Sequence, residues 1–204
     1  MNSSIAVSMV DDVFWKQCYD LTNEMRVHCY QLLVVPSFSY KISGLDPHEN
    51  YSMSVHFEHS NDKKWRWVKN QYVPFGRPDN IKSVSQTVFH SKGQQKGRWW
   101  MEKNVDFSYL QLTSQEVKQG VSDRIQLQAG YKWIPVLTIF KNGKLFHEAQ
   151  LEHTEFLAVN TVRNPKLIDL KNHIRKLRRG RRLYVPNFNL SRILPSSVHR
   201  IPLK

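Results

Sequence analysis

Two adjacent segments of the chain alternate apolar and polar residues with a period of two. The apolar members are Phe38, Tyr40 and Ile42 in the first segment and Tyr51, Met53, Val55 and Phe57 in the second. Successive side chains of a β-strand point to opposite faces of the sheet, so the pattern predicts two half-buried strands. Residues 44–50 supply the turn between them. This part of the chain must therefore form a sheet that buries one face.

Shorter strands are expected along the rest of the chain. Their ranges are 65–68, 83–90, 125–131, 136–141 and 156–162, and the Asn142-Gly143 pair between apolar runs is typical of a tight hairpin turn. Long helices do not alternate with these strands, which argues against a parallel βαβ sheet. We expect an all-β fold, a β-sandwich with short helices.

Two segments break the β pattern and predict helices. Asp11 and Asp12 precede a short, partly apolar run that reads as a capped helix. Late in the chain, apolar residues recur at three- and four-residue steps, as on one face of a helix over residues 166–177: Leu167, Leu170, Ile174 and Leu177. We expect a tail at 1–10, one domain at 11–183, and a proline-containing, loosely ordered tail at 184–204.

Positive charge is concentrated at the end of the predicted domain. The 204 residues carry a formal net charge of +13, and residues 171–182, the basic segment, contain seven of the 30 Lys and Arg and no acid. Such a charge attracts polyanions: nucleic acid, an anionic membrane face or a heparin-like glycan. A solvated tail or a nuclear-import signal is the simpler alternative. Because apolar positions anchor the segment to the domain, we favour contact with nucleic acid.

The sequence offers little catalytic or metal-binding chemistry. Cys18 and Cys29 are the only cysteines, and the nine histidines form no metal-binding pattern. Neither a phosphate loop nor a nucleophile elbow is present, so we expect no enzyme activity, cofactor or metal. The Trp99-Trp100 pair could stack nucleic-acid bases, but such a pair usually lies in the core on one side. The first residues do not read as a signal peptide, and we expect an intracellular protein.

Several motifs in order resemble the T-box family of transcription factors. The resemblance begins with Trp15 and Asn23-Glu24-Met25, and continues with residues 36–47, which end in Ser-Gly-Leu-Asp-Pro. It then includes residues 76–79, His90, Gly97 with Trp100-Met101, residues 110–113, and residues 131–135 (Tyr-Lys-Trp-Ile-Pro). It closes with residues 156–159, Asn164, Leu170-Lys171, Gly180 and Arg182. The similarity spans residues 13–182, most of the chain.

The resemblance implies an immunoglobulin-like β-sandwich that binds duplex DNA and regulates transcription by RNA polymerase II in the nucleus, often of developmental genes. It also implies a DNA contact loop at Asn160, Thr161, Val162, Arg163 and Asn164, and a further position at Lys132. The family's Asn-Pro-Phe turn, whose two Phe residues enter the minor groove, falls on residues 175–182, with Leu177 and Arg181 at the Phe positions. Lys171, Arg178, Arg179 and Arg182 complete the predicted DNA-binding set. Some members bind palindromic sites as homodimers.

The chain departs from the family just before its first predicted strand. Members carry Gly-Arg-Arg-Met-Phe-Pro there, and one Arg reads guanine in the major groove. Counting back from Pro36, both arginines become leucine, at Leu32 and Leu33. A leucine cannot form the bidentate hydrogen bonds to guanine. We therefore expect a site preference different from the family's GGTGTGA half-site, unless another residue such as Arg26 takes this role.

Three alternatives remain open at the level of sequence. A basic RNA-binding or structural protein would expose aromatic residues on its strands for base stacking. A secreted glycan-binding sandwich would require export and a Cys18–Cys29 disulfide. A nuclease would require a carboxylate metal site, for which we find no convincing set of residues.

Overall fold

The computed structural model describes residues 4–27, 34–76, 84–117 and 123–179. The helices are α1 (Asp12–Asp20), α2 (Gly97–Glu102) and α3 (Pro165–Arg179), with a short 3-10 helix, η1 (Glu152–Thr154). The strands are β1 (Ala6–Met9), β2 (Glu24–Arg26), β3 (Ser39–Ser43), β4 (Asn50–Val68), β5 (Gln71–Pro74), β6 (Val88–Phe89), β7 (Gln95–Lys96), β8 (Val105–Asp106), β9 (Gln111–Thr113), β10 (Arg124–Gln126), β11 (Tyr131–Lys141), β12 (Lys144–Gln150) and β13 (Phe156–Val159).

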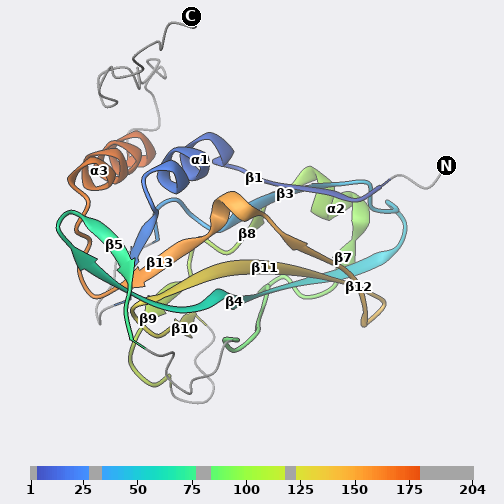
Figure 1. The fold of residues 1–204 in the computed structure, drawn as a ribbon. Helices are drawn as coiled ribbons and strands as arrows, with labels where there is room; N and C mark the ends of the chain where they lie inside the picture. The colour runs from blue at the N-terminus through green and yellow to red at the C-terminus, as the bar shows by residue number, and fades with distance from the viewer. Residues whose placement is uncertain (1–3, 28–33, 77–83, 118–122, 180–204) are drawn as a thin grey trace, which may run out of the picture.

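These strands form two sheets that face each other across one core. The larger sheet has the order β2-β13-β11-β4-β5, with β12 added to β11 and with β6 and β7 added to β4; the smaller sheet is β1-β3-β8. A separate parallel pair, β9 and β10, lies beside them. Helices α1 and α3 lie side by side outside the sheets (Figure 1). The fold is all-β and consistent with an immunoglobulin-like sandwich, as expected.

The alternation in the sequence predicts the core correctly. Its apolar members are almost fully buried, and they belong to one cluster that joins the two sheets: Phe38, Tyr40, Ile42, Tyr51, Met53, Val55 and Phe57. The Asn142-Gly143 turn is confirmed between β11 and β12. Both residues have positive φ (50° and 78°), which fits a type I′ hairpin turn.

Several strand boundaries differ from the sequence predictions. The segment 65–68 is the end of the long strand β4, because the largely polar stretch before it continues the strand without alternation. In place of a strand over 83–90, the described part of that range forms only β6 and a bridge at Val84. The Ser85 hydroxyl there accepts the Phe57 N–H at 2.9 Å and interrupts the ladder. In the range 125–131, β10 ends at Gln126 and Tyr131 begins β11, which extends the strand predicted at 136–141.

The expected N-terminal tail, residues 1–10, is partly folded. Residues 6–9 form β1, which pairs antiparallel with β3, and Met9 is buried. The segment passes so close to the turn after β3 that a Cβ on Gly44 would lie 2.4 Å from the Ser4 carbonyl oxygen. Gly44 also has a φ of +84°, which favours glycine. Since β1 is short and lacks clear alternation, only its pairing with β3 reveals it as a strand.

Trp100 belongs to the core, as predicted, although it lies on α2 rather than on a strand. Its side chain is fully buried, and its indole N–H donates to the Tyr51 carbonyl at 2.9 Å. The neighbouring Gly97 permits this packing, since a Cβ there would lie 2.1 Å from the Asp46 carbonyl oxygen. Trp99 is half-buried, so the Trp pair is not a free stacking platform.

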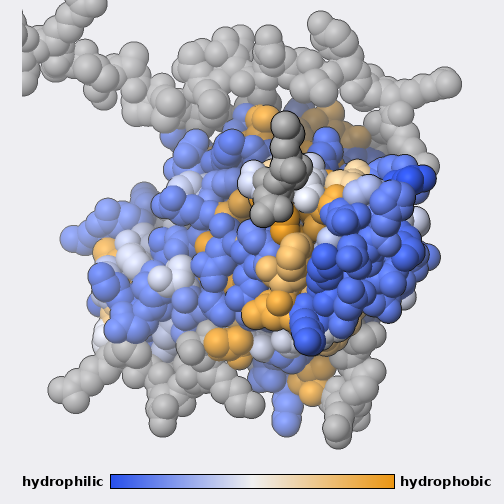
Figure 2. Space-filling view, turned by 90° about the vertical axis from the view of Figure 1, so that its right-hand side faces the viewer, coloured by the Kyte–Doolittle hydropathy of each residue, from blue (hydrophilic) through white to orange (hydrophobic). Residues whose placement is uncertain are grey.

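The end of the molecule opposite α3 is mostly hydrophilic but carries a strip of hydrophobic surface (Figure 2). Large apolar residues of β6 and β12 are exposed, namely Phe89, Leu145 and Phe146. None of the helices within the described ranges is long and apolar enough to cross a membrane.

Candidate nucleic-acid interface

Helix α3 is held against the sandwich by the apolar stripe that the sequence predicts. Leu167, Leu170 and Ile174 are buried and form a cluster with Cys18 of α1 and Val35. Three leucine-sized side chains buried in this way contribute several kcal/mol to docking, at about 1.5–3 kcal/mol each. The helix therefore has a fixed orientation, and the stripe separates its buried face from its solvent-facing positions.

The start of α3 is fixed by two residues that accept backbone N–H groups. The Asn164 side-chain oxygen accepts the N–H of Lys166 at 3.0 Å and that of Leu167 at 3.4 Å, which is the geometry of an N-cap with Pro165 at the first helical position. The Glu24 carboxylate accepts the N–H groups of Arg163 (2.6 Å) and Asn164 (2.9 Å). Asn164, predicted to contact DNA, is thus engaged in holding the helix.

Lys171, the first cation of the basic segment, points inward. Its side chain is 5% exposed, and its ammonium group donates to the Glu24 carbonyl at 2.6 Å. Burial lowers the pKa of Lys171 from 10.5 to about 8. The sequence predicts this lysine as a DNA contact, but in the structure its ammonium group lies inside and joins α3 to β2. The helical period explains this, since Lys171 follows the buried Leu170 and precedes Ile174 by one turn.

The remaining cations of α3 lie toward its C-terminal end. Lys176 is exposed, and Arg175 donates to the Asn172 side chain at 3.0 Å. Arg178 forms an ion pair with Asp11 and donates to the Ser37 hydroxyl at 2.9 Å. Asp11 makes no side-chain cap bond to α1, so the acid expected to cap that helix instead binds the end of α3.

The turn expected from residue 175 onward is not present in the described part. Residues 175–179 continue α3 as a helix. Proline at the second position of the family's turn would remove a backbone donor, whereas Lys176 supplies an N–H and permits the helix to continue. Leu177 is half-buried on this helix. The side chain of Arg179 and the whole of Arg181, Arg182 and the predicted tail at 184–204 lie outside the described residues.

The predicted contact loop before α3 presents some of its side chains to solvent. Asn160, Thr161 and Arg163 are exposed, whereas Val162 packs against the cluster between α1 and α3. The predicted strand over 156–162 ends at Val159 because the following residues turn toward Glu24. The exposed loop residues line a concavity of about 300 Å³.

The other side of this concavity is a hairpin that the sequence reasoning did not assign to the site. The β4–β5 hairpin (residues 65–74) contributes Trp65, Arg66, Trp67 and Tyr72 to the lining. The rings of Trp67 and Tyr72 meet edge to face across the two strands, with centroids 4.9 Å apart. Alternating aromatic and basic residues in 63–67 are the signal that could have identified it.

Lys132 also lies beside this hairpin. Its ammonium group pairs with Glu155 at 2.7 Å and sits 5.1 Å from the centre of the Trp65 ring. It lines a second concavity of about 610 Å³ between the hairpin and the start of α3, together with Tyr72 and Asn164. Burial, followed by the nearby Glu24 charge, raises the pKa of Tyr72.

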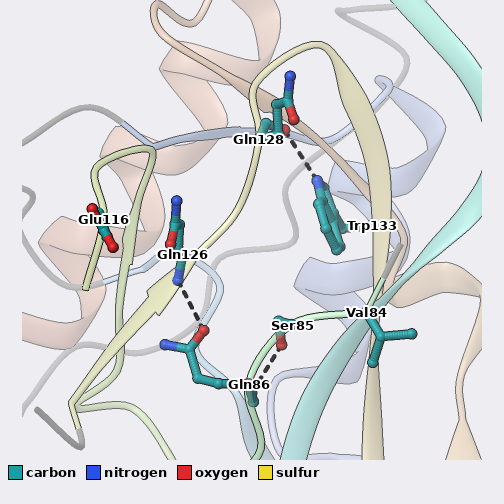
Figure 3. A pocket seen from close by; sticks show the side chains of 7 residues that line it. All are labelled: Val84, Ser85, Gln86, Glu116, Gln126, Gln128 and Trp133. Atoms are coloured by element: carbon teal, nitrogen blue, oxygen red, sulfur yellow. Dashed lines mark hydrogen bonds between the residues drawn. The ribbon is translucent and has the colours of Figure 1, made fainter. Parts of the chain in front are cut away.

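A third cavity, of about 560 Å³, has different chemistry (Figure 3). Its described lining contains the amides Gln86, Gln126 and Gln128, the acid Glu116, and no cation. Gln86 already accepts the Gln126 N–H at 3.4 Å and donates to the Arg124 carbonyl at 2.7 Å. A cavity with an acid and no cation does not suit a phosphate. Within the described ranges, His, Cys, Asp and Glu form no group that could hold a metal.

Cys18, half of the disulfide that the glycan-binding alternative requires, is a free thiol. It is fully buried between α1 and α3, and burial raises its pKa to about 11. Cys29 lies outside the described residues.

The prediction of an altered site preference concerns Leu32 and Leu33, which also lie outside the described residues. Arg26, the residue that could take the role of the missing arginines, is exposed on β2.

Comparison with known proteins identifies the same family across most of the chain. The T-box family model matches residues 7–183. The chain is 30% identical over 171 residues to T-box protein 11 of Caenorhabditis elegans, a match that covers 83% of this chain and 53% of that protein. It is 30% identical over 168 residues to the T-box transcription factor T homolog of Hemicentrotus pulcherrimus, covering 79% and 38% respectively. With T-box protein 37 of Caenorhabditis elegans it shares 30% identity over 187 residues, covering 87% and 59%. The matched region thus spans about half or less of the first two relatives and somewhat more of the third.

Proposed function

This chain is a member of the T-box family, and on that premise we propose that it is a duplex-DNA-binding transcription factor, not an enzyme. The observation that carries the proposal is the construction of α3. A buried stripe docks the helix, while Lys166 and Lys176 are exposed and the basic segment follows at its end. A rigid, basic helix at the surface of a sandwich suits the phosphate backbone of duplex DNA.

We propose a contact set that follows the sequence prediction with two changes. It comprises Asn160, Thr161, Val162, Arg163, Lys132, Leu177, Arg178, Arg179, Arg181 and Arg182, with Lys176 added. Lys171 and Asn164 are left out, because their polar atoms already bind Glu24, the N-terminus of α3 and Leu21. The DNA-binding domain extends from β1 to about residue 183, with residues 184–204 as a tail.

Arg178 has to exchange partners in this proposal. In the free protein it pairs with Asp11, at one-third exposure of its side chain. An exposed or half-exposed ion pair contributes about 0–1 kcal/mol, so a phosphate can replace the carboxylate at small cost. Until then Asp11 and Ser37 hold the guanidinium at the end of α3.

The protein regulates genes transcribed by RNA polymerase II in the nucleus, and its site preference differs from that of the family. Support for the altered preference comes from Leu32 and Leu33, which replace two arginines of the family motif. A lost bidentate contact to guanine removes about 1–3 kcal/mol of discrimination. Two copies bind palindromic sites, and the hydrophobic strip opposite α3 is a surface that a second copy can cover.

The test is selection of bound duplexes from a random DNA pool, with single-stranded RNA as competitor. We expect the wild type to enrich a duplex motif with weaker selection for guanine at the guanine positions of GGTGTGA. The Leu32→Arg variant should select guanine at these positions more strongly. Full recovery of GGTGTGA by the wild-type protein would refute the altered preference alone. Stronger binding to single-stranded RNA than to every duplex would refute the proposed function. Gel shifts on single and paired sites report whether two copies bind.

A further inference from the structure

The β4–β5 hairpin carries a basic surface of its own, separate from that of α3. Residues 63–76 include Lys63, Lys64, Arg66 and Lys69 and contain no acidic residue. Lys63, Arg66 and Lys69 are exposed. Asp62 directly precedes this run, so residues 62–76 carry four cations and one acid. The buried acid Glu24 lines the concavity at the start of α3 and not the one lined by Arg66.

The turn at the tip of the hairpin contains a lysine in a backbone conformation that favours glycine or asparagine. Lys69 and Asn70 form its two-residue turn with φ values of 46° and 64°. This left-handed conformation favours glycine or asparagine, and a lysine adopts it at a cost. A strained residue at an exposed tip is a reason to look for a role of its side chain. Here the side chain adds an exposed cation.

Arg66, on strand β4 of the same hairpin, is held in place by an aromatic ring. Its guanidinium lies 4.1 Å from the centre of the Phe75 ring, a cation–π contact that limits its motion. Arg66 and Arg163 both line the 300 Å³ concavity between hairpin and loop, whose described lining includes no Asp or Glu. Two arginines around an acid-free hollow form a site for an anion, and Thr161 adds a hydroxyl to it.

The position of this site relative to the basic segment suggests which anion it takes. The hairpin and Arg163 lie at the start of α3, whereas the exposed cations of the basic segment, Lys176 and Arg178, lie toward its end. The 15 residues of α3 span about 21 Å at 1.5 Å per residue. This distance equals about six base pairs, at 3.4 Å each along one strand. A duplex that runs along α3 therefore reaches both clusters.

We infer that the β4–β5 hairpin, through Arg66 and Lys69 and together with Arg163, binds the sugar–phosphate backbone of the same duplex about six base pairs from the contacts of the basic segment. This inference rests on the proposed function. The hairpin reads no bases; it lengthens the bound stretch of DNA and fixes the direction of the protein on it.

The test combines Arg66→Gln with Lys69→Asn and measures duplex binding by fluorescence anisotropy at several salt concentrations. Each lost phosphate contact lowers the slope of log affinity against log salt by about 0.9, so we expect a decrease of about 1.8. Affinity near physiological salt falls on the order of tenfold. Asparagine suits the left-handed conformation at position 69, so the variant remains as stable as the wild type in a thermal melt.

A matched control is available in another hairpin of the same sheet, between β11 and β12. Lys144 is an exposed lysine next to the Asn142-Gly143 turn, and β11 separates that turn from the β4–β5 hairpin by its full length. Lys144→Asn removes one positive charge, as Lys69→Asn does, and we expect no change in slope. On a duplex shortened to the base pairs under the basic segment, the Arg66→Gln/Lys69→Asn variant and the wild type should bind equally.

Three results would overturn the inference, and they separate it from the proposed function. If the wild type binds its selected duplex and the double variant binds with the same slope, the hairpin makes no backbone contact and the proposed function stands. Loss of affinity for single-stranded DNA only, with duplex binding unchanged, assigns the cations of the hairpin to the backbone of unpaired strands. If the wild type binds no duplex, both the proposed function and the inference fail.

Discussion

Replacing Lys171 by methionine tests whether this lysine is a buried residue that links α3 to β2 or a DNA contact. The two side chains have similar length, but methionine cannot carry the charge or donate to the Glu24 carbonyl. Lys171 lies on the inner side of α3, and Lys176 is exposed on the same helix. We therefore expect Lys171→Met to leave the salt dependence of DNA binding unchanged, and Lys176→Met to lower its slope by about 0.9.

The buried ammonium also predicts how stability depends on pH. Its pKa is about 8 in the folded protein and 10.5 when exposed, so the unfolded chain holds the proton more firmly between these values. Stability therefore rises with pH from about 8 to 10.5, by at most about 3 kcal/mol, or about 1 kcal/mol between pH 7.5 and 9. The Cys18 thiol acts in the opposite direction, since its raised pKa of about 11 makes stability fall between pH 9 and 11. Stability is therefore compared only up to pH 9, below the range in which the Cys18 thiol dominates.

The assay is urea unfolding followed by circular dichroism at pH 7.5 and pH 9. The wild type should gain about 1 kcal/mol, which corresponds to about 2–4 °C in a thermal melt, and Lys171→Met should lose this gain. Lys176→Met should keep it. A wild-type pH response that persists in Lys171→Met, or a salt slope that falls in it, would refute the inward position of Lys171.

Four other outcomes are expected. Wild-type affinity for duplex DNA should fall on the order of a hundredfold from 50 to 200 mM salt if about four phosphates are contacted; a flat response in the anisotropy titration would exclude the basic segment as the contact surface. Asn164→Ala should lower the free energy of unfolding by about 1 kcal/mol through loss of the α3 N-cap, and unchanged urea denaturation would contradict that cap. Gly97→Ala should lower the free energy of unfolding by more than about 2 kcal/mol, because its Cβ would overlap the Asp46 carbonyl oxygen; a near-native melting temperature would contradict this close contact between Gly97 and Asp46. Leu177→Ala with Arg181→Ala should abolish specific binding in gel shifts and keep the circular dichroism spectrum, whereas an unfolded variant would make this segment structural.

The sequence by itself determines those parts of the fold that depend on a local period. Tyr51, Met53 and Val55 are two residues apart, so their common face follows from strand geometry alone. The same holds for the stripe Leu167, Leu170 and Ile174 on α3. The sandwich class and the helix could be predicted for this reason, and the Asn142-Gly143 turn because both residues tolerate positive φ.

The tertiary structure alone decides what covers each polar residue and which distant segments meet. The helical period places Lys171 on the face of Leu167 and Ile174, but only the tertiary structure supplies a buried partner for its charge, the Glu24 carbonyl 147 positions away. Residues 6–9 form a strand because they pair with β3. The β4–β5 hairpin belongs to the candidate site because it faces the loop before α3 across one concavity. A local pattern fixes how side chains alternate along an element, but the partner of a buried charge depends on contacts between segments that are far apart in the chain.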